Sequence, residues 1–360
     1  MVLVDFDAGH ALWRPIVAVP ARNEAQRLPF LLDSLGRQSW LAGPECRLLV
    51  VLVLNNCDDN SAASAVHAAA RHPKLLLDVI EADFPASQAH VGSARRLALE
   101  RALELTDDRA RSVLLTTDAD AVPRADWIEN NLRAIDEGAA IVGGHILGDK
   151  TEEAFLGSYF LRRARRQLHF GRLIDRLSTL IDPIPHDPWP RHSDNTGASL
   201  AVRADVYAAV GGMPALPVRE DLAFVSSVRG AGYRLRHPLD VRVQVSARLD
   251  GRAPGGMADC LKGWLGAEAD GLPHYVEDPE SVVARLRKRR MCRESGSPRG
   301  WGRHPVWSSA GSPFFRRTET AEIERIAPDE PDAPLSVPIR AAIHQIKLMI
   351  ADRESETCVV

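Results

Sequence analysis

Short apolar runs alternate with amphipathic stretches through the first third of the chain. The first run is β-branched and closed by proline, and the second is apolar on both faces, as strands buried in a parallel sheet are. The expected strands are residues 15–20, 48–54, 75–80 and 112–117. The segments between them have apolar residues at helical spacing or are rich in alanine. The expected helices are residues 28–38, 59–72, 92–105 and a stretch after Pro123.

This alternation with short links predicts an α/β fold, a doubly wound sheet flanked by helices. Ligands of such sheets bind beyond the carboxyl ends of the strands. Polar clusters stand at three of these ends: VPARNEA after the first strand, LNNCDDN after the second, and Asp118 with Asp120 after the fourth. Taken singly, each cluster could be a helix cap, a turn or a first-turn acid. Together they predict one ligand site.

The sequence Asp118-Ala119-Asp120 suits a divalent hard cation, because carboxylate oxygens are its preferred ligands. One aspartate could bind the cation, which then bridges to a diphosphate, while its neighbour contacts a ribose hydroxyl. No GxGxxG follows the first strand and no GxxxxGK[ST] occurs in the chain. Their absence disfavours NAD enzymes and P-loop NTPases. Metal and arginines, rather than a glycine loop, are therefore expected to neutralise the phosphates.

Composition narrows the protein class without identifying a function. The chain has 360 residues, 45% of them hydrophobic and 26% charged, with a formal net charge of −3, so bulk electrostatics do not favour nucleic acid. Five scattered cysteines lack a CxxC pair, which argues against a disulfide framework or a zinc knuckle. The N-terminus lacks the pattern of a secretory signal, and the longest apolar run, 48–54, is far shorter than the ~20 residues of a membrane span. We expect a cytoplasmic protein without a transmembrane segment.

Two basic stretches without acids interrupt this mild acidity, residues 161–172 and 285–293. They are either solvated helix faces or surfaces for an anionic or lipid-linked acceptor, or for the inner face of a membrane. Aromatic residues are too sparse among them to favour single-stranded nucleic acid.

Six segments in order resemble glycosyltransferase family 2, inverting enzymes of the GT-A fold. They are VAVPARNEAQRLPFLLDSL, LNNCDDNS, VGSARRLAL, TTDADAVP, NTGASLAVRADVYAAVGGMP and REDLAFVSSVRGAGYRLRH. The resemblance covers roughly residues 14–256. It implies a Rossmann-like, mixed but mostly parallel sheet flanked by helices. It further implies a hexosyltransferase that uses a nucleoside-diphosphate sugar, most often a UDP- or GDP-sugar, with Mg²⁺ or Mn²⁺.

The resemblance also assigns roles to individual residues. The nucleotide would lie on residues that follow the first, second and fourth strands, together with an arginine of the third helix; these are Pro20, Arg22, Glu24, Asn55, Asn56, Arg95 and Asp118. Asp120 would bind the metal directly, with Asp118 near metal and ribose. Family members usually carry aspartates where this chain has Asn55 and Asn56, which leaves the base open. The donor-sugar pocket would be shaped by Asn195, Thr196 and Gly197.

Glu220 and Asp221 match the catalytic segment of the family, with Asp221 as the general base and Glu220 beside it. The residues alone predict that these acids begin a helix, because apolar residues at helical spacing follow them. First-turn acids also simply complement the helix dipole. As a general base, one carboxylate would take the proton of the attacking acceptor hydroxyl, a contribution of about 10²–10⁴-fold in rate.

Downstream features carry weaker predictions. Arg248 and Arg252 lie in a glycine-containing stretch, 243–256, which is either a mobile loop that closes on the diphosphate or an ordinary surface loop. Trp264 is either a stacking platform for the acceptor or a core residue. His237 is either structural, the more frequent case for such a histidine, or a third metal ligand.

We divide the chain into a GT-A domain, 1–274, and a C-terminal extension, 275–360, that is mostly helical. The domain comprises a nucleotide-binding half, 14–125, and a donor-sugar and acceptor half, 126–274. In the extension, 298–317 resembles a loop or lid and 327–338 a linker. Ile339, Ile343, Ile346 and Ile350 form the apolar side of a helix that packs on the body or on a second copy of the chain, as in a homodimer.

The sequence therefore predicts a metal-dependent transferase that moves a sugar to an acceptor hydroxyl with inversion. One alternative is a retaining GT-A transferase of the type that glycosylates phosphoglycerate. A second is a nucleotide-sugar-binding protein without turnover, which the intact Asp118, Asp120 and Asp221 disfavour. A nucleotidyltransferase is a weaker option, because no glycine-rich loop bearing lysine follows the first strand.

Overall fold

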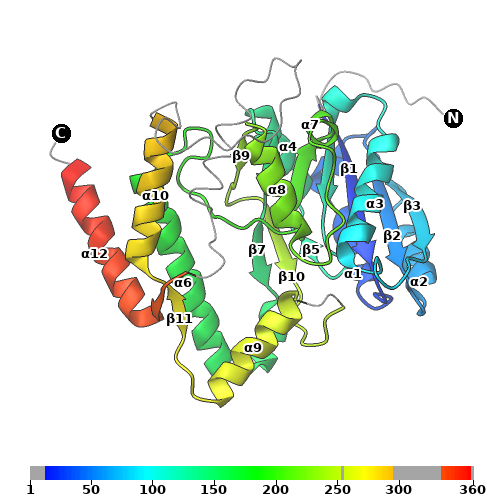
Figure 1. The fold of residues 1–360 in the computed structure, drawn as a ribbon. Coiled ribbons are helices and arrows are strands. Elements are labelled where there is room, and N and C mark those ends of the chain that lie inside the picture. Colours follow the sequence, from blue (N-terminus) through cyan, green and yellow to red (C-terminus); the bar gives the residue numbers. More distant parts are fainter. Residues whose placement is uncertain (1–12, 253–254, 295–333, 358–360) are drawn as a thin grey trace.

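The computed structural model describes residues 13–252, 255–294 and 334–357 (Figure 1). The strands are β1 (Arg14–Ala21), β2 (Leu48–Asn55), β3 (Leu75–Ala82), β4 (Ser112–Thr116), β5 (Val122–Pro123), β6 (Ile141–Gly143), β7 (His145–Gly148), β8 (Leu200–Arg203), β9 (Leu235–Arg236), β10 (Arg242–Val245), β11 (Tyr275–Glu277) and β12 (Ser336–Pro338). The helices are α1 (Leu28–Gly36), α2 (Ser61–Ala69), α3 (Val91–Glu104), α4 (Trp127–Asp136), α5 (Lys150–Phe155), α6 (Gly157–Ile181), α7 (Ala204–Ala209), α8 (Glu220–Gly230), α9 (Met257–Ala269), α10 (Pro279–Glu294) and α12 (Ile339–Thr357). The short 3₁₀ turns are η1 (Ser39–Ala42) and η2 (Arg109–Arg111).

A seven-stranded sheet in the order β3-β2-β1-β4-β8-β6-β9 forms the centre of the molecule. Strands β3, β2, β1 and β4 run parallel, and β8 runs antiparallel to both β4 and β6. A smaller sheet, β5-β10-β7, lies beside it. The predicted fold, a mixed and mostly parallel sheet flanked by helices, is confirmed, and all four strands of the first third occur within two residues of their expected bounds.

Helices cover the central sheet on both faces, as the doubly wound pattern requires (Figure 1). One face buries the leucines of α1, the alanines of α2 and Trp127 of α4. The opposite face buries small and aromatic side chains of α3, α7 and α8, among them Tyr207 and Phe224. The leucine stripe expected in α1 is wholly buried, which explains why that segment is helical despite the proline at its second position.

A third cluster lies apart from the sheet and joins α6, α10 and α12, which stand side by side in Figure 1. Leu177 of α6, Leu286 of α10 and Ile346 of α12 are buried in it. The amphipathic helix predicted near the C-terminus therefore packs on the body of its own chain. The mostly helical extension is confirmed over the described residues, and the boundary at residue 274 stays a prediction.

The structure bears on two expectations for the second half of the chain. The end of the expected linker forms β12, which pairs antiparallel with β11, so residues 336–338 are held by a backbone ladder. Trp264 is half-buried against Phe160 and His274, with ring centroids 6.0 and 6.2 Å away, which favours its core alternative over a stacking platform. The expected lid, 298–317, lies outside the described residues. Among the described helices, none is both long and apolar enough to cross a bilayer.

The buried face of α12 offers a test of this packing. Replacing Ile346, which is fully buried, with alanine should lower the free energy of unfolding by about 2–5 kcal/mol, because a large core side chain leaves a cavity. Leu348→Ala, on the same helix but 54% exposed, should change it by less than about 0.5 kcal/mol. Urea denaturation measures both, and equal effects of the two variants would contradict the docking of α12.

Candidate functional site

Three of the parallel strands end at one edge of the sheet, and the predicted site residues follow them. β1 pairs with β2 on one side and with β4 on the other, all in the same direction. The chain leaves β1 through Arg22 and Glu24, leaves β2 at Asn55 and leaves β4 two residues before Asp118. The convergence expected from the sequence therefore occurs at the carboxyl edge of the sheet.

Arg95, on α3, occupies the centre of this edge. Its Nη2 donates to Asp118 Oδ1 at 2.7 Å and its Nε to Glu220 Oε1 at 3.1 Å. Its Nη1 donates to the Thr116 hydroxyl at 3.0 Å and to the Gly197 carbonyl at 2.8 Å. The side chain is only 4% exposed. Burial alone would lower the pKa of Arg95, but the charges of Asp118 and Glu220 outweigh burial and raise it.

This placement makes Arg95 an organiser of carboxylates. The resemblance places it near the base or the diphosphate, and that role stays a prediction. A buried guanidinium is stable when carboxylates and other acceptors engage its donors, and four of the five N–H groups of Arg95 are engaged in this way. Arg95 therefore connects β4, α8 and the segment at Gly197.

Glu220 and Asp221 begin α8, as predicted, but face different surroundings. Glu220 is 4% exposed and bound to Arg95, and burial raises its pKa although Arg95 opposes that shift. Asp221 is partly exposed: its Oδ2 accepts the Gly197 N–H and its Oδ1 the Leu222 N–H, both at 2.8 Å. Of the two acids, Asp221 is thus the one with a surface open to a ligand.

Asp120 and Glu24 face a second arginine, Arg248, from the segment after β10. Arg248 Nη2 lies 3.0 Å from Asp120 Oδ2, and Arg248 Nη1 donates to Glu24 Oε2 at 2.8 Å. Burial raises the pKa of Asp120 to about 6, and the negative charge of Asp118 adds to the rise while Arg248 counters it. A hollow of about 270 Å³ opens beside Asp120, lined by Arg27, Phe30, Asp120, Val122, Asp149, Gln244, Val245 and Ser246.

These carboxylates fit a hard divalent cation in chemistry. Asp118 and Asp120 present oxygen ligands one residue apart, the ligand type that such a cation prefers. Each aspartate also has an arginine partner in this structure, Arg95 for Asp118 and Arg248 for Asp120. A metal would therefore share Asp120 with a guanidinium or displace it.

Some of the residues expected to contact the nucleotide are hydrogen-bonded to the protein backbone, and others have polar atoms without a partner. Arg22 Nη1 donates to the Ala89 carbonyl at 3.0 Å. Asn56, at a positive φ of 48°, exchanges two hydrogen bonds with the Phe84 backbone, so it holds the turn after β2. Asn55 donates to the His90 carbonyl while its buried Oδ1 has no hydrogen-bond partner. Pro20 is buried within β1.

The segment expected to shape the sugar pocket lies next to Glu220 and Asp221, the predicted catalytic acids. Gly197 contacts both Arg95 and Asp221 through its backbone, and the Thr196 hydroxyl is buried without a partner. Asn195 Oδ1 lies 3.0 Å from His237 Nε2. Arg252, by contrast, pairs with exposed Asp250, so the structure does not bring it to the carboxylates as it does Arg248.

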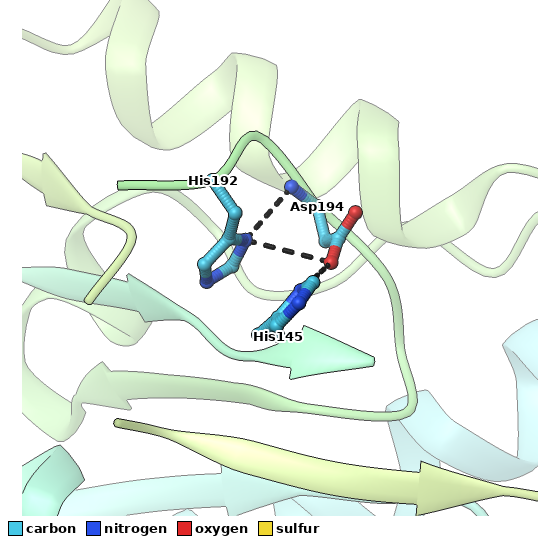
Figure 2. A group of neighbouring side chains, drawn as sticks. All are labelled: His145, His192 and Asp194. Atoms are coloured by element: carbon cyan, nitrogen blue, oxygen red, sulfur yellow. Dashed lines mark hydrogen bonds and ion pairs between the residues drawn. The ribbon is translucent and has the colours of Figure 1, made fainter. Parts of the chain in front are cut away.

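A cluster of histidines and aspartates behind this segment escaped the sequence analysis (Figure 2). His145 Nδ1 lies 2.7 Å from Asp194 Oδ2, and the Asp194 N–H donates to His192 Nδ1 at 3.0 Å. The next pair, His237 and Asp187, makes contacts of 2.8 Å through both backbone and ring. Scattered positions and the absence of a spacing motif explain why the pattern was not visible in the sequence.

His145, His192 and Asp194 are close enough together to hold a metal. His145 Nδ1 is bonded to Asp194 Oδ2 and His192 Nδ1 to the Asp194 N–H, whereas His192 Nε2 is buried without a hydrogen-bond partner. Asp194 Oδ2 also accepts the Ile146 N–H at 3.2 Å. We therefore interpret the cluster as a brace for residues 187–197. His237 has both ring nitrogens engaged, by Asp187 and Asn195, which favours its structural alternative.

Comparison with known proteins identifies the family. The sequence model of glycosyl transferase family 2 matches residues 16–186, the span that contains Asp118, Asp120 and Arg95. The first half of the chain is therefore similar to glycosyl transferase family 2. The match confirms the predicted family and enzyme class, a glycosyltransferase, and the sheet order agrees with the GT-A fold implied by the resemblance. No curated protein matches the chain.

Three solved structures align with the chain at low sequence identity. A Pyrobaculum calidifontis mannosyltransferase in complex with GDP-Man and Mn²⁺ is 18% identical, with a TM-score of 0.45 over 96% of this chain and 75% of that one. TarS residues 1–349 from S. aureus, in complex with UDP, is 15% identical, with a TM-score of 0.46 over 79% and 73%. Glucosyl-3-phosphoglycerate synthase from M. tuberculosis is 17% identical, with a TM-score of 0.38 over 72% and 81%.

Gly197 tests the role of Arg95 in the family 2 site. A Cβ at this position would lie 2.4 Å from Arg95 Cζ, and Arg95 is tied to four partners. Gly197→Ala should therefore lower the free energy of unfolding by about 1–3 kcal/mol through overpacking. Gly171→Ala, in α6 with open space around the added carbon, should instead raise it by about 0.5–1 kcal/mol. Denaturant titration decides, and a neutral Gly197→Ala would show that Arg95 is not confined.

The histidine cluster predicts a pH dependence of stability. Burial lowers the pKa of His192 to about 3, whereas an unfolded histidine titrates near 6.5. Between these values the unfolded chain binds the additional proton, so stability falls as pH drops below 6.5. At pH 5.5 this residue alone should cost about 1.4 kcal/mol relative to pH 7.5.

His192→Asn removes the titrating ring while its Oδ1 can still accept the Asp194 N–H. Between pH 7.5 and pH 5.5 the free energy of unfolding should therefore decrease by different amounts in the two proteins: the decrease in His192→Asn should be about 1.4 kcal/mol smaller than in the wild type. Burial raises the pKa of Asp175 to about 6, an opposing trend that is common to both proteins and cancels in the comparison. His67→Asn, at an exposed position in α2, should keep the wild-type pH dependence. If His192→Asn kept the pH dependence of the wild type, burial would not lower the pKa of His192 in the folded protein.

Proposed function

We propose that this protein transfers a sugar from a nucleoside-diphosphate sugar to an acceptor hydroxyl, with inversion of the anomeric centre. The observation that carries the proposal is the meeting of the two acid pairs at Arg95. Asp118 and Glu220, which are far apart in the sequence, are held by the same guanidinium, so Asp120 and Asp221 lie at the same edge of the sheet. The reaction needs a group that neutralises the diphosphate of the donor and a base that takes the proton of the acceptor hydroxyl. Residues at this edge could supply both.

The donor is proposed to enter along the ends of β1, β2 and β4. Asp120, with Asp118, would hold Mg²⁺ or Mn²⁺, and the bound cation would neutralise the departing nucleoside diphosphate. The unpartnered oxygens of Asn55 and Thr196 are available to the nucleotide and the sugar, respectively. A UDP- or GDP-sugar is the donor class that we expect from the family.

Asp221 is proposed to act as the general base. The acceptor oxygen attacks the anomeric carbon, the bond from that carbon to the diphosphate oxygen breaks, and the hydroxyl proton passes to the Asp221 carboxylate. The Gly197 and Leu222 N–H groups fix the orientation of this carboxylate. Glu220, buried against Arg95, holds the site together and leaves proton transfer to its neighbour.

The same two hydrogen bonds are the observation in favour of the alternative, a retaining transferase. Each oxygen of Asp221 already accepts a backbone N–H, so the protein engages both oxygens before an acceptor hydroxyl approaches. A retaining reaction does not require a base at this position. The anomeric configuration of the product, read from its NMR coupling constant, separates the two: inversion supports the proposal and retention supports the alternative.

The acceptor is proposed to be anionic, either free or lipid-linked. Exposed arginines line α6 at Arg162, Arg165 and Arg172, and the neighbouring Tyr159 is 67% exposed. Arginine forks bind phosphate and carboxylate oxygens in pairs, so this face suits an acceptor with such a group.

Variants of the two acid pairs test the proposed chemistry. Asp221→Asn should lower kcat by about 10²–10⁴-fold while the protein still binds donor, because only the base is lost. Asp120→Asn should abolish the metal-dependent rise in melting temperature with nucleoside diphosphates; a ligand at 100 times its Kd contributes about 2.7 kcal/mol to stability. A panel of UDP- and GDP-sugars with Mn²⁺ or EDTA supplies the ligands.

Asp205→Asn serves as the matched control, since Asp205 is likewise an acid in the first turn of a helix, α7. It should alter neither turnover nor the thermal shift. If Asp221→Asn kept most of its activity, the general-base role would be wrong. If no nucleoside diphosphate shifted the wild-type melting temperature in a metal-dependent way, the donor site itself would be refuted.

A further inference from the structure

Arg248 occupies a position between two carboxylates that would otherwise be unpaired. Its guanidinium makes a two-pronged contact with Glu24, which is 5% exposed, and reaches Asp120 Oδ2 at 3.0 Å. A planar guanidinium that binds one carboxylate with both arms and a second with one of them is a charge-assisted arrangement of the stronger kind. In this structure Arg248 is the cation on Asp120.

The charges of the site show why a cation is needed there. Five carboxylates gather at this edge and two guanidinium groups face them; they are Glu24, Asp118, Asp120, Glu220 and Asp221, with Arg95 and Arg248. Arg95 is buried and tied to Asp118 and Glu220. Glu24 and Asp120 therefore depend on Arg248 for their neutralisation.

Arg248 differs from Arg95 in its freedom to leave. Its side chain is 20% exposed, against 4% for Arg95. It belongs to the loop after β10, and Glu152 anchors the start of this loop by accepting from the Ser246 hydroxyl and the Ala247 N–H, both at 2.7 Å. Because the anchor precedes Arg248, the arginine side chain can turn away from Asp120 without breaking it.

We propose that Arg248 is a displaceable counter-ion, which holds Asp120 in the metal-free protein and moves to the donor's diphosphate when a divalent cation takes its place. This inference rests on the proposed function. A divalent cation on Asp120 repels a guanidinium 3.0 Å from the same carboxylate, and the released fork matches the spacing of phosphate oxygens. Metal and diphosphate consequently strengthen each other's binding, while Arg248 and metal compete.

Binding of Mn²⁺, followed by the loss of the free-ion signal in electron paramagnetic resonance, tests this competition on the full-length protein. Without nucleotide, Arg248→Gln should bind Mn²⁺ at least about fivefold more tightly than the wild type, the lower end of typical couplings between ligands. With saturating UDP or GDP, whichever binds, the wild type should gain Mn²⁺ affinity and the variant should gain much less. Arg124→Gln, which removes the same charge from an exposed arginine paired with Asp126, should behave as the wild type.

Each outcome bears on a different part of the inference. Equal or weaker Mn²⁺ binding by Arg248→Gln, with nucleotide binding intact, overturns the counter-ion role and leaves the proposed function standing. An absence of Mn²⁺ binding in wild type and variant alike overturns both. If Arg248→Gln does not fold, Arg248→Lys decides the matter, because lysine keeps the charge but cannot form the fork. It should then bind Mn²⁺ with an affinity above that of the wild type, and a wild-type affinity refutes the proposal.

Discussion

The geometry of the candidate site depends on one buried guanidinium. Arg95 comes from α3 and is bonded to Asp118 after β4, to Glu220 at the start of α8 and to the Gly197 carbonyl. These partners are 23, 125 and 102 residues away in the sequence, in the order Asp118, Glu220 and Gly197. Breaking a buried ion pair by removing one partner typically costs about 3–5 kcal/mol, since the remaining charge has no other solvation. Arg95 thus ties these segments together, alongside the pairing of β4 with β8 and the Thr117 hydroxyl, which donates to the Ala198 carbonyl at 2.8 Å.

Arg95 binds only one acid of each adjacent pair, Asp118 with Asp120 and Glu220 with Asp221. Asp118 and Glu220 are taken by Arg95, whereas Asp120 faces Arg248 and Asp221 faces the Gly197 N–H. Glu220 is buried and Asp221 is partly exposed, while the side chains of Asp118 and Asp120 are 36% and 23% exposed, so three of the four acids keep a surface open to a ligand. The two acids at the strand end and the two at the helix start are therefore not redundant. In each pair one acid is bound by Arg95 and the other has different partners.

The features that follow from local periodicity could be predicted from the sequence. The strands 48–54 and 75–80 and the helix at 28–38 follow from the spacing of apolar residues, and Glu220 begins its helix as expected. Contacts between distant segments could not be predicted in this way. The resemblance places Arg95 near the base or the diphosphate, and Arg248 is expected either in a loop that closes on the diphosphate or in an ordinary surface loop. Nothing local in the sequence indicates their carboxylate partners, which lie 23 to 224 residues away. The histidine cluster was missed for the same reason, since its members meet only through the fold.

The two arginines of the candidate site differ in how firmly the protein holds them. Arg95, enclosed by four protein partners, has four of its five N–H groups engaged by the protein and is only 4% exposed. Arg248, partly exposed on a loop, neutralises carboxylates that a ligand would also use. A diphosphate is itself an anion and would be repelled by the uncompensated acids if it arrived alone. On the proposed function, the donor therefore binds together with a cation. Arg248, on the loop after β10, is then the side chain whose partners change when the cation and the diphosphate bind.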